Sequence, residues 1–554
     1  MAQPGLLYVT MQPKSSSNLT EAQFHDWYNN EHGPTRLRLP FFTNGFRYRA
    51  SDAPPSEQTP EWMALYDMTD MAELTRDAYL RLRDPPVKSQ RESETMAKIK
   101  VDRKLFDFVE ERKAENFRRL EEVENEGVGN VMVAVFLDLN PGEDKKEELD
   151  RWYREEHIDM LSKVPGWLRT RRYVTSSLLP NEPVEYLALH EYTPQNGLEG
   201  EEFIAATTTK WKDEIFSKTV KDKRRRVWEL YYTFGPAPRH LAEGLQKWEL
   251  SDPESAKTTT LPDSVGGAGA VESWVTTADG VELPYRLEGS ADPAAPLIVL
   301  SNPILTHWAI WDAFVASFFS NPDNKRYRVL RYLTRGRSSK FGTKPITVDV
   351  LASDIIALLD ALRVKKAAAV IGVSLGGATA LNTSLKYPSR VGKLIACDTN
   401  SKSPVGNRKA WGDRIVVAEK ESLLSSTGEK IVGDELAELS TRRWFLPESY
   451  QNASLVPRIL EVRQVVKANS LEGFKNCVQA LCDYDLREEM KSSEIEGMFV
   501  VGSGDGILPD TMKEMAGAYG KSGARYEVIE GAGHLPMVEK PQEYAALMTK
   551  FLAS

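Results

Sequence analysis

The feature that most constrains how this chain folds is the segment 371–377, which reads Ile-Gly-Val-Ser-Leu-Gly-Gly. An apolar run, 367–373, precedes Ser374, and a helix-like stretch, 378–387, follows it. Gly-x-Ser-x-Gly between a strand and a helix is the pattern of a nucleophile elbow, a sharp turn that exposes the serine hydroxyl above the edge of a sheet. The glycines allow backbone approaches that a Cβ atom would block. Because so short a pattern also arises by chance, its interpretation depends on the residues that follow.

An acid and a histidine follow the elbow in the order that a catalytic triad requires. Asp505 comes after the apolar run 499–502, and His534 comes after a later strand-like run, 525–529. The chain order Ser, Asp, His is that of α/β-hydrolases. His534 would take the proton of Ser374 and later return it to the leaving group, while Asp505 would fix the tautomer of the imidazole. Asp398 is the rival acid, because some hydrolases carry the carboxylate one strand earlier.

Strands and helices alternate through 271–554, which predicts a mostly parallel sheet. Residues 272–277 and 283–287 flank Asp-Gly and are expected to form a hairpin at its start. A largely helical stretch, about 405–491, interrupts the alternation and would cover the elbow as a cap. Three of its arginines could hold a substrate carboxylate, although exposed arginines on a helix surface fit the pattern equally well; they are Arg414, Arg442 and Arg443.

Longer stretches of this half resemble 3-oxoadipate enol-lactonases over nearly all of residues 272–554. The resemblance is carried by segments 300–303, 327–332, 334–336, 387–391, 443–445, 485–487 and 533–541. It implies an α/β-hydrolase fold and hydrolysis of an ester or lactone, either enol-lactone-like or polyketide-derived, through an acyl-Ser374 intermediate. Such hydrolysis needs no cofactor, and the partner would be a small-molecule substrate.

The sequence departs from that family where an oxyanion hole is expected. Pro303 occupies a position that often offers an N–H group, and proline has none. The N–H of Leu375 should be one donor. The second could shift to Ile304, or His307 or Trp308 could substitute for it.

Other departures bear on the substrate and not on the fold. Arg337 and Ser338 replace a usual His-Gly pair, and Leu333 replaces a usual Asp. Trp308 and Trp444 are the residues that we expect to contact the substrate.

The N-terminal half contains an internal repeat. Residues 24–32 recur as 149–157 with Trp, Tyr, Glu and His in register, an offset of 157 − 32 = 125. Strand-like runs flank both copies, so that 1–125 and 126–240 each read β-α-β-β-α-β, a ferredoxin-like order. Residues 5–236 resemble the dimeric α+β barrel superfamily, and the Trp-Tyr-x-x-Glu-His helix resembles its EthD-like branch, here with both copies in one chain.

The two repeats place His32 and His157 at the end of that helix. In the resembled superfamily a histidine at this place can face a cavity, and a neutral imidazole can shuttle protons. The barrel could then be an isomerase or lyase with His32 or His157 as base. Such a fusion would be meaningful, since muconolactone isomerases have a similar barrel and make the substrate of enol-lactonases. A histidine at such a place is more often structural, with His190 as a wall residue, and the barrel could be only a folding or dimerisation module.

Composition excludes several classes of function. A net charge of −9 over 554 residues disfavours a nucleic-acid partner. Three cysteines make no even disulfide framework, and no apolar run approaches ~20 residues, so we expect no membrane partner and a cytoplasmic protein. No clustered His, Cys and carboxylate spacing indicates a metal site. Residues 241–270 are rich in Gly, Ser, Thr and Pro and read as a flexible linker that proteases would cut between Ser251 and Ala270. A homo-oligomer is compatible with the sequence.

Overall fold

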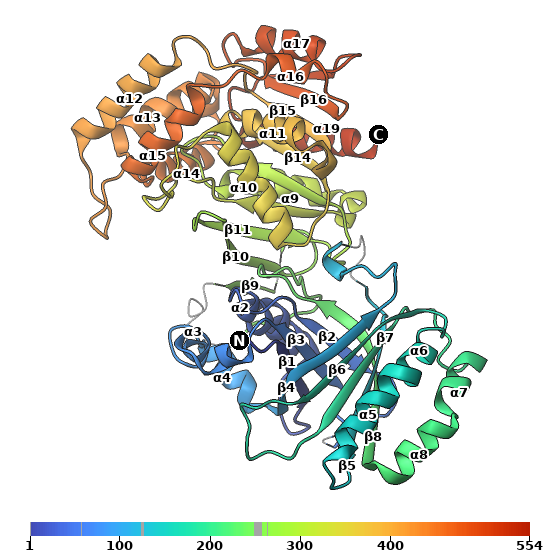
Figure 1. The fold of residues 1–554 in the computed structure, drawn as a ribbon. Helices are drawn as coiled ribbons and strands as arrows, with labels where there is room; N and C mark the ends of the chain where they lie inside the picture. The colour runs from blue at the N-terminus through green and yellow to red at the C-terminus, as the bar shows by residue number, and fades with distance from the viewer. Residues whose placement is uncertain (1, 57, 123–126, 249–257, 263) are drawn as a thin grey trace. The chain divides into compact units, whose positions relative to one another are not determined.

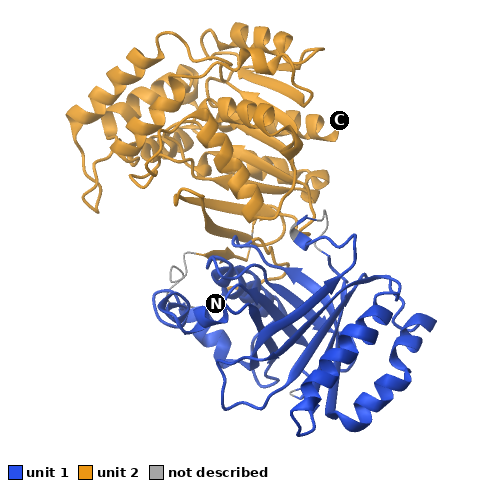
Figure 2. Cartoon of the chain, in the orientation of Figure 1, with its two compact units in different colours: residues 1–238, 248–256 blue, residues 239–247, 257–554 orange. Residues whose placement is uncertain are grey.

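The computed structural model describes residues 2–56, 58–122, 127–248, 258–262 and 264–554. The chain divides into two compact units (Figure 2). One comprises Met1–Pro238 and Trp248–Ala256, and the other comprises Arg239–Lys247 and Lys257–Ser554. Each unit has its own buried apolar clusters, so each is described by itself. No helix in the described ranges combines the length and the hydropathy that a membrane span needs.

The first unit is a closed barrel of eight antiparallel strands in the order β1-β3-β2-β8-β5-β7-β6-β4 (Figure 1). The strands are β1 (Gly5–Pro13), β2 (Phe46–Ala50), β3 (Trp62–Met68), β4 (Ile99–Lys113), β5 (Val131–Leu139), β6 (Trp167–Thr175), β7 (Tyr186–Tyr192) and β8 (Val220–Thr233). Side chains alternate between the two faces of each strand. Tyr8, Phe106, Phe136 and Trp228 belong to a cluster drawn from all eight strands, which is the filled interior of the barrel.

Each half of the barrel contributes four consecutive strands and the helices that cover their outer face. The runs β4-β1-β3-β2 and β8-β5-β7-β6 meet through the pairs β2–β8 and β4–β6. The α-helices are α1 (Glu21–Trp27), α2 (Gly33–Leu37), α3 (Asp77–Leu80) and α4 (Gln90–Ala97), then α5 (Asp144–Trp152), α6 (Ile158–Leu161), α7 (Glu201–Thr207) and α8 (Lys210–Lys218). The 3-10 helices are η2 (Met71–Thr75), η3 (Arg81–Arg83) and η4 (Leu120–Glu122).

The repeated Trp-Tyr-x-x-Glu-His segment has the same local conformation in both halves. Thr20 and Gln23 form a capping box that begins α1. After α1 and after α5 the chain widens into a π-helix, η1 (Tyr28–His32) and η5 (Tyr153–His157). Single π-turns within helices are frequent at functional sites. The histidine that ends each π-helix is therefore placed alike by its own segment of chain.

The second unit is built on a nine-stranded sheet in the order β17-β16-β15-β14-β12-β13-β11-β10-β9 (Figure 1). The strands are β9 (Thr259–Leu261), β10 (Ala270–Thr276), β11 (Glu282–Gly289), β12 (Leu297–Ser301), β13 (Arg328–Tyr332), β14 (Ala367–Val373), β15 (Val391–Cys397), β16 (Glu496–Gly502) and β17 (Arg525–Ile529). The six strands from β12 to β17 are parallel, and β9, β10 and β11 pair antiparallel. Every residue of β12 is buried, which requires helices on both faces of the sheet.

The helices of this unit fall into those that pack on the sheet and those of the cap. The first group is α9 (Asp312–Ser320), α10 (Val348–Ala361), α11 (Leu375–Lys386), α17 (Leu508–Ala518), α18 (Pro536–Glu539) and α19 (Pro541–Ala553). The cap, between β15 and β16, holds α12 (Asn407–Glu421), α13 (Asp434–Trp444), α14 (Val456–Lys467), α15 (Leu471–Val478) and α16 (Arg487–Met490). The 3-10 helices are η6 (Trp308–Trp311), η7 (Pro322–Arg326), η8 (Pro388–Arg390), η9 (Pro447–Gln451) and η10 (Gln479–Leu481).

The expected linker is in part a folded segment. Strand β9 (Thr259–Leu261) pairs with β10, and Gly269 N–H donates to the Ala242 carbonyl, so these residues belong to the second unit. The expectation of flexibility over 241–270 was therefore wrong for them, because the polar Thr-rich run makes ladder hydrogen bonds that its composition did not reveal. The expected cutting region from Ser251 to residue 257 lies outside the described residues.

Candidate active site

Ser374 occupies a strained turn between β14 and α11. Its backbone has φ +59° and ψ −120°, in the positive-φ region that residues with a Cβ atom rarely adopt. Gly372 and Gly376 make this turn possible. A Cβ on Gly372 would lie 1.9 Å from the Gly376 carbonyl oxygen, and one on Gly376 would lie 2.2 Å from that of Ser301. The Ser374 hydroxyl is half-buried and forms no hydrogen bond with the residues that the structure describes.

The sheet brings four polar side chains to one edge. Strands β14, β15, β16 and β17 are parallel neighbours, so their carboxyl ends lie together. Ser374 and Asp398 directly follow β14 and β15, while Asp505 and His534 lie in the loops after β16 and β17. The topology thus gathers the predicted nucleophile, both candidate acids and the predicted base.

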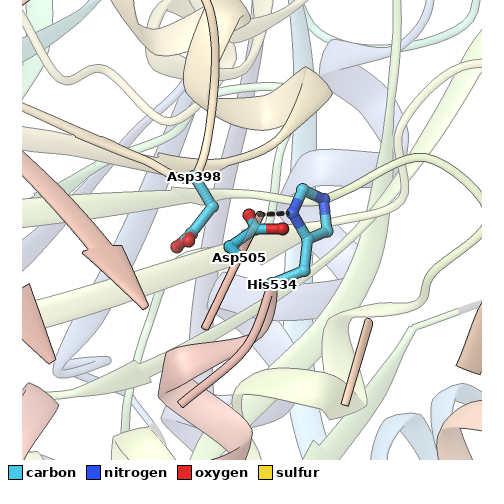
Figure 3. Close-up of side chains that lie close together, drawn as sticks. All are labelled: Asp398, Asp505 and His534. Carbon is cyan, nitrogen blue, oxygen red and sulfur yellow. Dashed lines mark hydrogen bonds and ion pairs between the residues drawn. The ribbon is translucent and has the colours of Figure 1, made fainter. Parts of the chain in front are cut away.

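His534 is hydrogen-bonded to Asp505 and not to Asp398 (Figure 3). Its Nδ1 lies 2.6 Å from Asp505 Oδ2, and its Nε2 has no hydrogen bond with the described residues. Burial opposes the ionised form of Asp505, but the charge of His534 and the hydrogen bond with it outweigh burial. The pKa of Asp505 is therefore held below its ordinary value. An ionised acid on Nδ1 leaves Nε2 as the free proton acceptor of the ring.

Asp398 lies beside Asp505 in a different state (Figure 3). It is 1% exposed, its Oδ1 accepts a hydrogen bond of 2.9 Å from Gly502 N–H, and its Oδ2 has no partner. Burial and the neighbouring Asp505 charge raise the pKa of Asp398 well above its usual range, so the site favours the neutral form of this carboxyl. Asp398, Asp505 and His534 would also offer a metal ion three ligand atoms within 4.8 Å of one another.

The loop after β12 lies against the start of α11. A Cβ on Gly376 would lie 2.7 Å from the Asn302 carbonyl oxygen, so this loop and the elbow are in contact. Leu375 is the first residue of α11, where a backbone N–H has no acceptor within the helix. Ile304 is buried, two residues beyond Asn302. Both predicted oxyanion donors therefore belong to segments that meet beside Ser374.

The alternative donors have structural roles of their own. His307 Nδ1 accepts the N–H of Ala309 at 3.1 Å and caps η6, while burial lowers the pKa of His307 to about 4. Trp308 is half-buried, and its carbonyl accepts from Arg331 Nη1 at 3.2 Å.

The cap and the His534 loop are joined by contacts that sequence reasoning missed. Trp444 is 1% exposed, its ring stacks on His534 with centroids 6.3 Å apart, and its carbonyl accepts His534 N–H at 2.8 Å. Glu539 is buried and accepts from Gly533 N–H at 2.5 Å, Leu446 N–H at 3.2 Å and Ser449 Oγ at 2.5 Å. The feature of the sequence that could have revealed these contacts is the glutamate that follows the Gly533-His534 segment.

The three cap arginines differ in their partners. Arg442 donates to Glu438 at 2.7 Å and lies over the Tyr450 ring. Arg414 and Arg443 have no ion pair with the described residues. Burial and the charge of Arg414 both lower the pKa of Arg443, and the charge of Asp505 raises it by a smaller amount. Both arginines therefore lack a carboxylate partner among the described residues, although Arg414 Nη1 donates to the Ala410 carbonyl at 2.9 Å and its guanidinium lies over the Trp411 ring.

In the first unit the two repeat histidines have different surroundings. His32 Nδ1 lies 2.8 Å from Glu92 Oε1, and Arg36 Nη1 donates to the His32 carbonyl at 2.6 Å. His157 Nδ1 lies 3.2 Å from the Ala206 carbonyl oxygen, with no carboxylate bound to its ring. His190 is buried beside His157, their ring centroids 6.1 Å apart.

Comparison with known proteins identifies the class of the second unit. Residues 298–547 match the model of the Alpha/beta hydrolase family. Together with the parallel sheet and the elbow, this match makes the C-terminal half of the chain an α/β hydrolase.

Within that class, this half is similar to 3-oxoadipate enol-lactonases. Two curated proteins of that name from Acinetobacter baylyi are each 28% identical over 281 residues, covering 50% of this chain and 96% of theirs. A crystal structure of the enol-lactonase from Burkholderia xenovorans is 26% identical and covers 51% of this chain and 100% of its own, with a TM-score of 0.44.

Proposed function

We propose that the C-terminal unit hydrolyses an ester or lactone through an acyl intermediate on Ser374. The observation that carries the proposal is the 2.6 Å hydrogen bond between His534 Nδ1 and Asp505, at the same edge of the sheet as the strained turn that holds Ser374. It supports Asp505 as the acid that orients the base, the residue that the sequence also favours over its rival Asp398.

The proposed chemistry follows from these three side chains. Ser374 Oγ attacks the carbonyl carbon while His534 Nε2 takes its proton, and Asp505 stabilises the imidazolium that forms. The Leu375 and Ile304 N–H groups would stabilise the negative oxygen of the tetrahedral intermediate. His534 then returns the proton to the leaving oxygen as the ester C–O bond breaks. Water, deprotonated by the same imidazole, releases the acid and restores Ser374.

We further propose that the substrate carries a carboxylate and is an enol lactone or a similar cyclic ester. The unpaired Arg414 and Arg443 offer an anion a partner in the cap, and Arg443 interacts with Asp505. The similarity to enol-lactonases supports the same substrate class. Trp308, which is half-buried, remains the aromatic residue proposed to contact the substrate, whereas Trp444 is 1% exposed and instead packs on His534.

Turnover of an activated ester and of a five-membered enol lactone by the full chain tests the proposal. Ser374→Ala should lower kcat on both by about four to six orders of magnitude, because the reaction loses its nucleophile. A Ser374→Ala chain with parental kcat on either compound refutes the acyl-Ser374 route.

For the barrel, we infer an internal duplication of an EthD-like, ferredoxin-like unit. Support comes from the two runs β4-β1-β3-β2 and β8-β5-β7-β6 and from the π-helix that ends in His32 and in His157.

A further inference from the structure

The second half of the barrel unit contains a cavity that the hydrolase chemistry does not use. Its volume is about 170 Å³, and its walls come from β5, β7, β8 and the helices that cover them. Aromatic and histidine side chains dominate the lining, including Trp152, Tyr153, His157, His190 and Phe216. An engineered cavity of similar size, about 150 Å³, holds benzene, so a small planar ligand fits here. We call it the His157 cavity.

His157 presents a lone pair to this cavity. The Ala206 carbonyl 3.2 Å from Nδ1 can only accept a hydrogen bond, so Nδ1 carries the hydrogen and Nε2 is the acceptor. The ring stacks on Trp152 with centroids 4.2 Å apart, which fixes its orientation. Burial lowers the pKa of His157 to about 3, and the imidazole is neutral. Its Nε2 has no hydrogen bond with the described part of the chain.

His190 presents the complementary group. Its Nδ1 lies 3.0 Å from Thr170 Oγ1, and that oxygen already accepts the Trp167 indole N–H at 3.1 Å. Among the described residues the Thr170 hydroxyl has no other acceptor than His190 Nδ1, so we assign its hydrogen to that bond, which leaves the ring hydrogen of His190 on Nε2. His190 is 3% exposed, and its Nε2 has no partner among the described residues. The cavity thus contains one imidazole acceptor and one imidazole donor with ring centroids 6.1 Å apart.

Two cations line the cavity without a counter-ion. The basic run 221–226 lies in β8, where alternate side chains face opposite sides. Arg224 and Arg226 pair with Glu185 and Asp52. Lys223 and Arg225 line the cavity instead and form no ion pair with the residues that the structure describes. Their charge favours an anionic ligand.

In the first half of the barrel, the corresponding positions are filled by a packed ring or held by a hydrogen bond. Tyr66 stands at the strand position of His190, and its ring stacks on Phe234 with centroids 5.8 Å apart. His32 is bound by the Glu92 carboxylate, which also accepts the Trp27 indole N–H at 2.6 Å. The donor and acceptor pair with free Nε2 atoms is therefore a property of the second half.

We propose that the His157 cavity binds a small planar carboxylate with an acidic C–H bond and catalyses a proton shift on it. Lys223 and Arg225 hold the carboxylate, and His190 Nε2–H donates to the ligand's enol or enolate oxygen. In the enol, His157 Nε2 removes the hydroxyl proton, and the electron pair of the broken O–H bond forms the C=O bond. The electron pair of the former C=C bond then takes the same proton back from His157. One O–H bond breaks, one C–H bond forms, and no further reactant is needed. The proposal does not depend on the hydrolase function.

Two probes test it in the full chain carrying Ser374→Ala, which removes the hydrolase nucleophile from the readout. Calorimetry measures the Kd of benzoate, and loss of enol absorbance measures the conversion of enol-phenylpyruvate to its keto form. His157→Phe keeps a ring on Trp152 and should lower the conversion rate about 100-fold, the scale of general acid–base catalysis. Lys223→Met with Arg225→Met should weaken benzoate binding about tenfold.

Arg224→Met is the matched control, since it removes the same charge from the same strand on the opposite face. It should leave the benzoate Kd and the conversion rate within about twofold of the parent. The proposal is overturned if the parent does not bind benzoate, if His157→Phe converts the enol at the parental rate, or if Arg224→Met weakens binding as much as the double variant. Melting curves of each variant exclude loss of folding.

Discussion

At the scale of single residues, two carboxyl groups that follow neighbouring strands have different states of charge. The contact with His534 favours the ionised form of Asp505, whereas burial and the charge of Asp505 favour the neutral form of Asp398. A protonated Asp398 has a hydrogen to give and an oxygen that accepts Gly502 N–H at 2.9 Å. Asparagine at position 398 offers the same hydrogen-bond donor and acceptor. At position 505 its neutral amide cannot replace the charge of a carboxylate.

Asp505→Asn should therefore lower kcat on an activated ester by about three to four orders of magnitude, the scale of a tautomer error at a triad histidine. Asp398→Asn should stay within about tenfold of the parent, and asparagine tolerates the φ of +43° at that position. Stopped assays of both variants, with melting curves as the control for folding, decide the assignment. A disabled Asp398→Asn beside a normal Asp505→Asn would move the acid to the earlier strand.

We also expect a single residue to set the preference of the site for a negatively charged substrate. Arg443→Met should raise KM for mono-4-nitrophenyl adipate about tenfold, because a carboxylate loses its cation in the cap, and should leave KM for the uncharged 4-nitrophenyl hexanoate within about twofold. Arg442→Met is the matched control, since that neighbour is already paired with Glu438. Equal KM changes for both esters would argue against a substrate carboxylate at Arg443.

At the scale of elements, the site is held together by the joint between the cap and the His534 loop. The end of α13 supplies the carbonyl that accepts His534 N–H, and Glu539 in α18 binds both the loop before His534 and the chain after α13. Three donors converge on one buried carboxylate, so a change there displaces two segments at once.

Glu539→Gln should destabilise the hydrolase unit by about 1–3 kcal/mol and lower kcat, because an amide NH₂ cannot accept all three donors. Glu543→Gln, an exposed position on α19, should change neither quantity. Chemical unfolding and steady-state kinetics give the two readouts. Unchanged stability and kcat in Glu539→Gln would show that the joint does not position His534.

Much of this arrangement was predictable from local sequence. The elbow, the alternation of strands and helices and the positions of Asp505 and His534 follow from patterns that act over a few residues. The choice between Asp398 and Asp505 was not settled by pattern, since both follow strands and only the fold shows which one meets the imidazole. The role of Glu539 and the pairing of β9 depend on contacts between distant segments, which short-range patterns do not encode.

For the molecule as a whole, the buried histidines of the barrel unit make the stability of the fold depend on pH. In the barrel, His157 and His190 are neutral because burial depresses the pKa of each. The unfolded chain binds protons at these positions below about pH 6.5, whereas the folded barrel does not. Acid therefore favours the unfolded state between about pH 6.5 and pH 3, and the stability from neutral His157 is fully present only above that window.

Lowering the pH from 7 to 5 should reduce the free energy of unfolding by about 2 kcal/mol through His157 alone. His157→Phe should show a correspondingly smaller loss over the same interval. Urea unfolding of both chains at the two pH values measures the difference, in which all other titrating groups cancel. The same pH-dependent loss in both chains would mean that His157 is not buried in its neutral form.

The central claim is that Ser374 is the nucleophile of the α/β-hydrolase unit, and active-site labelling tests it most directly. The parent chain is treated with a fluorophosphonate probe and the labelled residue is located by peptide mass spectrometry. We expect one adduct on Ser374, lost in Ser374→Ala and strongly slowed in His534→Ala, because the base activates the hydroxyl. Labelling of Ser503, or undiminished labelling of the Ser374→Ala chain, would contradict it.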